Sequence, residues 1–242
     1  MALFERALRE LGHEGTDLWH RRGHYFTKIF GISFGGGQRH PGNFLHSQKD
    51  EDAWIKFSTS EEVVNLARRI DNLLACYFPK IHTLYCNVLD DLCKENPALR
   101  RNWEGCCFGA SSLNFTHAVT NKHRDFRNLL FGQCAVWSCG SFDYQKGGHL
   151  IVWDLNLVIE FPPGSVALLP SALLSHSNTA IGRHEQRHSM TFFSASGLFR
   201  WRHNNFMSDK DFCAGASHEE RMKWDEHRER LWETGVELLT DM

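Results

Sequence analysis

The 242-residue sequence contains no run of apolar residues close to the roughly 20 that a membrane-spanning helix needs. It also has no dense basic run, and its net charge of −2 excludes a protein that holds nucleic acid mainly by bulk charge. The first residues lack the apolar middle segment of a secretory signal peptide. We therefore expect an intracellular protein without membrane contact, in which any attraction for a polyanion comes from a local basic rim.

The eight cysteines include no Cys-x-x-Cys pair, the spacing that typically marks a zinc module. Cys106 and Cys107 are adjacent, whereas Cys134 and Cys139 are five positions apart within a strand-like run. We therefore interpret the cysteines as free thiols buried in the core. A chain of this length can bury a large core without disulfide bonds.

The order of sequence patterns predicts the fold. Apolar residues recur with helical spacing over 63–74 and 84–92, and Thr59 with Glu62 predicts a capping box before the first of these helices. Short strand-like runs separated by Gly and Pro follow, at 113–119, 129–139, 149–154, 157–161, 166–169 and 188–193. We expect an α+β fold with a double-stranded β-helix core of the jelly-roll or cupin type, and with the N-terminal helices packed on its outside.

We expect a single catalytic domain over 1–242. Residues 1–105 form a helical elaboration, 106–205 the β-helix core, and 206–242 a helical tail that opens with a capping box at Ser217. Three consecutive glycines and a Pro-Gly pair in 31–43 predict an irregular loop. Aromatic residues flank this loop, so we expect it to lie over a site and not to be a free linker.

The segment around His123 carries the strongest indication of chemistry. Alternate residues of an extended segment point to the same side, so His123 and Asp125 could hold one ion, with His176 as the third ligand. Two His and one carboxylate form the facial triad of non-haem Fe(II) oxygenases. Arg187 and Ser189 follow and share a strand face, which suits the far carboxylate of 2-oxoglutarate. A zinc hydrolase could use the same three ligands, but it would leave Arg187 and Ser189 without a role.

Together these residues resemble the Fe(II)/2-oxoglutarate dioxygenases. Within that superfamily the sequence is similar to the TET/JBP branch, and most similar to fungal TET-like DNA base oxygenases. The resemblance extends from about residue 20 to 205 and includes the stretches 33–38, 41–43, 147–155 and 196–201.

The resemblance implies the cofactors and their ligands. Fe(II) would be bound by His123, Asp125 and His176, and 2-oxoglutarate would chelate the iron and place its 5-carboxylate on Arg187 and Ser189. We assign Asn114 to the same co-substrate site. With O2, the enzyme would oxidise 5-methylcytosine in DNA to 5-hydroxymethylcytosine and to more oxidised products.

The resemblance also implies contacts to a base that is flipped out of the duplex into the pocket. We assign Asn43, Asn128, Phe193 and Arg124 to substrate binding, with Phe193 as a stacking partner. Family members can carry Asp where this chain has Asn128, and an amide, unlike a carboxylate, both donates and accepts. N6-methyladenine therefore stays open as an alternative substrate, as do a hydroxylase for a non-nucleic-acid substrate and a binding module with a decayed site. We expect a monomer that works in the nucleus.

Overall fold

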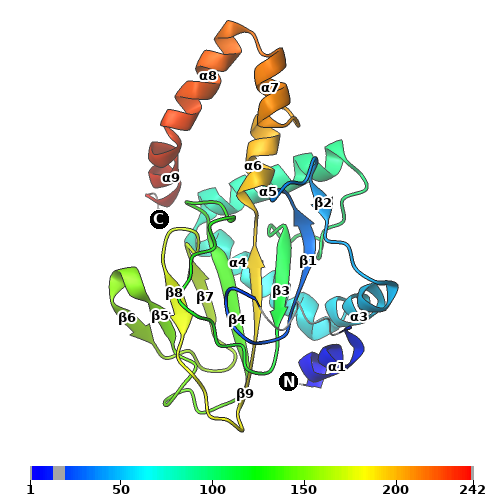
Figure 1. Cartoon of the computed structure of the whole chain (residues 1–242), viewed down its shortest axis with the longest axis vertical. Coiled ribbons are helices and arrows are strands. Elements are labelled where there is room, and N and C mark those ends of the chain that lie inside the picture. Colours follow the sequence, from blue (N-terminus) through cyan, green and yellow to red (C-terminus); the bar gives the residue numbers. More distant parts are fainter. Residues whose placement is uncertain (1, 13–19, 241–242) are drawn as a thin grey trace.

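The structure, a computed structural model, describes residues 2–12 and 20–240. Two antiparallel sheets lie at its centre, and helices cover the outer face of the larger one (Figure 1). The expected α+β fold with a double-stranded β-helix core is therefore confirmed. Among the described residues, no helix has both the length and the apolarity needed to cross a membrane.

The larger sheet consists of β1 (Thr27–Ser33), β2 (Gly42–Asn43), β3 (Ala110–Asn114), β4 (Cys134–Ser141), β7 (Val166–Leu169) and β9 (Gln186–Phe193). Its strand order is β2-β1-β3-β9-β4-β7. The smaller sheet consists of β5 (Leu150–Val152), β6 (Leu157–Ile159) and β8 (His176–Asn178), in the order β6-β5-β8. Apolar side chains of β5 and β7 pack together between the two sheets.

Strand β9 shows how the larger sheet separates core from site. Its residues Met190 and Phe192 are fully buried in the cluster that also contains the apolar faces of the outer helices. The alternate residues Arg187, Ser189 and Phe193 therefore point to the opposite face, toward the smaller sheet. One strand thus supplies both the packing surface for the helices and the polar lining of the interior.

The helices form a layer and an extension. Helices α1 (Ala2–Glu10), α3 (Gln48–Ser58), α4 (Glu61–Tyr77) and α5 (Pro79–Glu95) pack on the larger sheet. After β9 the chain continues into α6 (Ser196–His203), α7 (Asp209–Gly215), α8 (His218–Glu229) and α9 (Leu231–Leu239). Helices α7 and α8 project from the body as an arch, and α9 returns toward it (Figure 1).

The two predicted capping boxes have different outcomes. Ser217 and Glu220 form the expected capping box at the start of α8. Thr59 is not the N-cap of α4, because it closes the preceding helix α3, which the sequence patterns did not reveal, and its hydroxyl donates to the Ile55 carbonyl. Ser60 occupies the N-cap position of α4 instead, without a side-chain hydrogen bond to the helix.

The Gly-rich segment 31–43 is only partly irregular. Residues 31–33 complete β1, and Gly42 and Asn43 form β2, which pairs back onto Ser33 and Ile32. Gly31 has φ +112°, and a Cβ there would lie 2.4 Å from the Gly109 carbonyl oxygen, so only Gly allows this approach to the residues before β3. The N-terminal segment therefore contributes two strands to the sheet as well as helices.

A second glycine, Gly140 in β4, yields a stability prediction. It has φ +135° and lies opposite Arg187, and a Cβ would lie 2.1 Å from the Gln186 carbonyl oxygen. We expect Gly140→Ala to lower the free energy of unfolding by about 3 kcal/mol or more, because backbone strain and overlap add together. The matched control is Gly164→Ala, at φ +91° with open space around it, which should cost only about 1–2 kcal/mol. Equal losses for the two variants in urea denaturation would contradict this account of Gly140.

Candidate active site

A small backbone bridge brings the two histidines of the predicted triad together. The His123 amide donates to the His176 carbonyl at 3.0 Å, and the His176 amide donates to the His123 carbonyl at 2.9 Å. The Asp125 amide donates to the Ser171 carbonyl at 2.9 Å. The segment that follows β3 is thereby fixed along β8 and the turn before it, although 53 positions (176 − 123) separate the histidines in the chain.

The three side chains converge on one point. Nε2 of His123 lies 3.7 Å from Oδ1 of Asp125, and Nε2 of His176 lies 3.7 Å from Oδ2. One ligand atom from each residue lies within 4.8 Å of the other two. Bonds of about 2.0–2.2 Å to a shared ion would place such atoms about 3–4 Å apart. The convergence predicted from the sequence is therefore confirmed.

The surroundings fix the tautomer of both imidazoles. Nδ1 of His123 lies 2.7 Å from the Asn121 carbonyl, and Nδ1 of His176 lies 2.9 Å from the Leu174 carbonyl. A carbonyl only accepts, so each ring must donate from Nδ1 and present the lone pair of Nε2 to the centre. Burial, together with the neighbouring His176, lowers the pKa of His123 to about 4. This ring is therefore neutral at pH 7 and can bind a metal.

Arg187 is a buried cation that has no counter-charge among the residues that the structure describes. Its side chain is 1% exposed, Nη1 donates to the Ala118 carbonyl, and Nε and Nη2 have no partner among the described residues. Burial lowers its pKa to about 10, so it is still charged at neutral pH. Because a buried, unpaired charge is strongly unfavourable, this arrangement indicates an anionic ligand that approaches the two free N–H edges.

Polar residues on neighbouring strands lie beside Arg187. Asn114 of β3 lies opposite Ser189 of β9, and its Nδ2 donates to Ser189 Oγ at 3.2 Å. Ser138 of β4 lies opposite Ser189 on the other side, and its buried hydroxyl has no partner among the described residues. Directly paired residues share a sheet face, so Ser138 joins this row. Ser138 is not among the residues predicted from the sequence, where its position within a strand-like run was the one indication of this role.

A cavity of about 540 Å³ opens beside Asp125. The Gly-rich loop lines it, as expected, through Phe34, Gly35, Gly36 and Gln38. Its remaining walls are polar, basic and aromatic and come from other segments of the chain: His20, Arg21, Arg22, Ile29, Ser33, Phe44, Phe126, Arg127, Asn128, Thr191, Phe193 and Ala195. The cavity therefore connects Asp125 of the triad to basic side chains.

Two of the residues predicted to bind substrate, Asn128 and Phe193, do line this cavity. The Asn128 amide nitrogen donates to Ser171 Oγ at 3.1 Å, and the amide oxygen has no hydrogen bond to another described residue. Phe193 is half-buried at the end of β9. The structure thus places an amide and an aromatic ring in the walls of the cavity that opens beside Asp125.

Asn43 and Arg124, also predicted to bind substrate, have side-chain partners outside the cavity wall. The Asn43 amide donates to the Arg100 carbonyl at 2.7 Å and accepts from the Arg100 amide at 2.9 Å, so it anchors β2 and does not line the cavity. Arg124 donates to Ser175 Oγ at 3.0 Å and to Asp154 Oδ1 at 3.1 Å, also outside the cavity wall. For Arg124 the reason is alternation, because it lies between His123 and Asp125 on an extended segment and therefore points to the opposite side.

The chain is similar to known proteins in structure but matches none of the compared families or curated proteins in sequence. A solved structure of NgTET1 in complex with 5mC DNA aligns with a TM-score of 0.55 and 17% identity, covering 71% of this chain and 61% of that chain. Over the aligned part, this chain shares the fold of NgTET1.

Two bacterial oxygenase structures are also similar. A 2OG-Fe(II) oxygenase family oxidoreductase from Burkholderia pseudomallei aligns at 13% identity and a TM-score of 0.43, covering 80% of this chain and 77% of the other. A Pseudomonas putida prolyl-4-hydroxylase aligns at 13% identity and a TM-score of 0.36, covering 79% and 83%.

Proposed function

We propose that this chain is an Fe(II)- and 2-oxoglutarate-dependent dioxygenase that oxidises 5-methylcytosine in DNA. The observation that carries the proposal is the combination of the His123–Asp125–His176 triad with the buried, unpaired Arg187. A metal site alone would fit several reaction classes. Arg187 adds a buried cation that could bind a carboxylate. Of these reaction classes, the pair favours the one that uses a dicarboxylate co-substrate.

The triad fits Fe(II) in donor type and in openness. Two neutral imidazoles and one carboxylate occupy one side of the ion and leave other positions for co-substrate and oxygen. Bound Fe(II), with 2-oxoglutarate and O2, supplies the oxidising power to hydroxylate a methyl C–H bond, and 2-oxoglutarate becomes succinate and CO2. The protein's task is to hold the triad in place, which the carbonyls of Asn121 and Leu174 do through Nδ1 of each ring.

Arg187 and its neighbours would hold the 5-carboxylate of 2-oxoglutarate. The free Nε and Nη2 of Arg187 can donate to a carboxylate, which suits the planar guanidinium better than an ammonium group. The hydroxyls of Ser189 and Ser138 provide further donors on the same face, and Asn114 orients Ser189. The barrel interior would thereby exclude water from the charged end of the co-substrate.

The cavity mouth supports DNA as the substrate. Arg21, Arg22 and Arg127 line it, and the Nη1 of Arg22 lies 3.6 Å from the carboxylate of Asp125. Phe126 is 66% exposed at this rim, with the guanidinium carbons of Arg21 and Arg127 at 5.2 and 5.9 Å from its ring centroid. Exposed aromatic and basic side chains together suit a phosphate backbone and an unstacked base. The fold neighbour NgTET1 was solved with 5mC DNA.

The base itself would enter the cavity from a flipped-out nucleotide. Phe193 offers a stacking face, and the Asn128 amide oxygen can accept from the exocyclic amino group of a base. Cytosine and adenine both carry such an amino group, so N6-methyladenine is the second candidate. As a DNA-modifying enzyme the protein would act in the nucleus, and we propose that it does so as a monomer.

Substitution of Arg187 tests the co-substrate site. We expect Arg187→Lys to raise the KM for 2-oxoglutarate about 10-fold or more, because a charge-assisted fork of hydrogen bonds is lost while the charge is kept. Metal binding, measured by calorimetry, should be unchanged. Arg183→Lys, at an exposed position of the turn before β9, is the matched control. An unaltered KM in the decarboxylation assay would remove Arg187 from the proposed site.

The substrate is tested with methylated duplex DNA, Fe(II) and 2-oxoglutarate. We expect mass spectrometry of the nucleosides to show 5-hydroxymethylcytosine, because the cavity beside the triad can hold a flipped base. A parallel duplex with N6-methyladenine is assayed for formaldehyde, which its hydroxylated product releases. Formaldehyde without oxidised cytosine would assign adenine, and no product from either duplex would contradict a DNA substrate.

Matched asparagine variants show whether the base contact is specific. Asn128→Ala should reduce DNA oxidation sharply while uncoupled turnover of 2-oxoglutarate persists. Asn43→Ala, outside the cavity, should instead lower the thermal stability, since both groups of its amide bind Arg100.

A further inference from the structure

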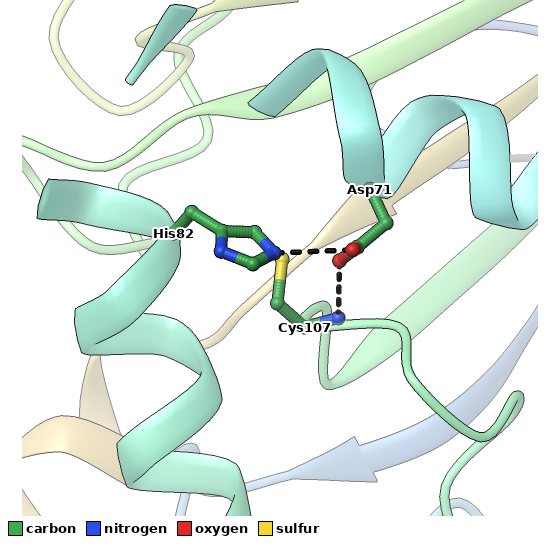
Figure 2. A group of neighbouring side chains, drawn as sticks. All are labelled: Asp71, His82 and Cys107. Carbon is green, nitrogen blue, oxygen red and sulfur yellow. Dashed lines mark hydrogen bonds and ion pairs between the residues drawn. The ribbon is translucent and has the colours of Figure 1, made fainter. Parts of the chain in front are cut away.

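A second group of metal-binding side chains lies in the helical layer, away from the triad. Asp71 of α4, His82 of α5 and Cys107 of the segment before β3 point toward one another (Figure 2). One ligand atom from each lies within 4.8 Å of the other two, the same criterion that the triad meets. Nε2 of His82 and Oδ2 of Asp71 are 3.1 Å apart.

Cys86 lies beside this group. It lies four residues after His82, which places both on one face of α5. Its Sγ lies 3.7 Å from Nε2 and 3.9 Å from Nδ1 of His82. The sulfur therefore lies beside the imidazole, next to the group of three ligand atoms.

The backbone fixes the carboxylate in an orientation suitable for a ligand. The Cys107 amide donates to Oδ1 of Asp71 at 2.9 Å, so Oδ2 is the oxygen that faces the other donors. Ligating carboxylates are commonly held in this way by a hydrogen bond to the oxygen that does not bind the metal. Asp71 is 8% exposed and Cys107 is buried, so the group is closed to bulk solvent on that side.

We propose that Asp71, His82 and Cys107 bind one Zn²⁺ ion in a tetrahedral structural site, with Cys86 turning its side chain toward the ion as the fourth ligand. Four protein donors that include two thiolates are typical of structural zinc, whereas the triad has only nitrogen and oxygen donors and keeps positions open. Binding forms two Zn–S bonds and releases the two thiol protons to solvent, with the imidazole neutral and the carboxylate ionised.

The position of the site defines what the ion would do. It joins α4, α5 and the segment that enters β3 three residues after Cys107, and β3 carries Asn114. The ion would therefore clamp the helical layer to the strand that borders the co-substrate site, and binding energy would add to folding energy. The spacing 71, 82, 86 and 107 matches no local zinc motif, so the sequence alone predicts free thiols at these cysteines.

Metal analysis of the full-length protein tests this proposal. We expect one zinc ion per chain in the wild type, in Asp125→Ala and in Cys76→Ser, and loss of zinc in Cys86→Ser and Cys107→Ser. Cys76 is the matched control because it is an exposed thiol on α4, outside the cluster. Zinc retained by Asp125→Ala would show that the ion is not bound at the triad. Co²⁺ substituted into the wild type should give thiolate charge-transfer and intense tetrahedral absorption bands, which Cys86→Ser abolishes.

Thermal stability gives a readout that does not depend on activity. A chelator should lower the Tm of the wild type and leave that of Cys86→Ser unchanged, because that variant has no zinc to lose. Cys86 is half-buried, so its Ser variant is the one expected to keep the fold. Three outcomes would overturn the proposal: zinc absent from the wild type, zinc retained by Cys86→Ser, or a Cys86–Cys107 disulfide found by mass spectrometry of the native protein.

Discussion

The two-way backbone bridge between His123 and His176 is the constraint on which the site depends. These two hydrogen bonds join the segment after β3 to the smaller sheet, and the metal-binding geometry follows from them. Each histidine then uses Nδ1 on a nearby carbonyl, so both Nε2 atoms face Asp125 without a choice of tautomer. Ordinary antiparallel pairing therefore brings the two imidazoles together, since directly opposed residues place their side chains side by side.

Burial of Arg187 is the complementary feature. The larger sheet carries apolar residues toward the helices and polar residues toward the interior. This alternation places the guanidinium where, within the described part of the chain, a single carbonyl accepts from it. Such a cation is unfavourable in the protein alone, so a ligand carboxylate would stabilise both partners. The arginines at the cavity mouth would have a different role, because exposed charges attract a polyanion over a longer range.

The sequence predicted those features that depend on local periodicity. Alternation along an extended segment correctly placed His123 with Asp125, and helical spacing located α4 and α5. The same alternation directs Arg124, between these two residues, away from the cavity, although it was predicted to bind substrate. Asn43 could not be placed, because its partner Arg100 is 57 positions away in the chain. The Asp71–His82–Cys107 group was missed for the same physical reason, since its members come from three elements that only the tertiary fold brings together.

The most direct test of the central claim is anaerobic absorption spectroscopy of the protein loaded with Fe(II). If the triad and Arg187 hold iron and 2-oxoglutarate together, addition of 2-oxoglutarate without oxygen should produce a visible metal-to-ligand charge-transfer band, saturating at one equivalent per chain. Succinate, which lacks the 2-oxo group, should give no band. The absence of a band at saturating 2-oxoglutarate, or an equal band in the Asp125→Ala variant, would contradict the account.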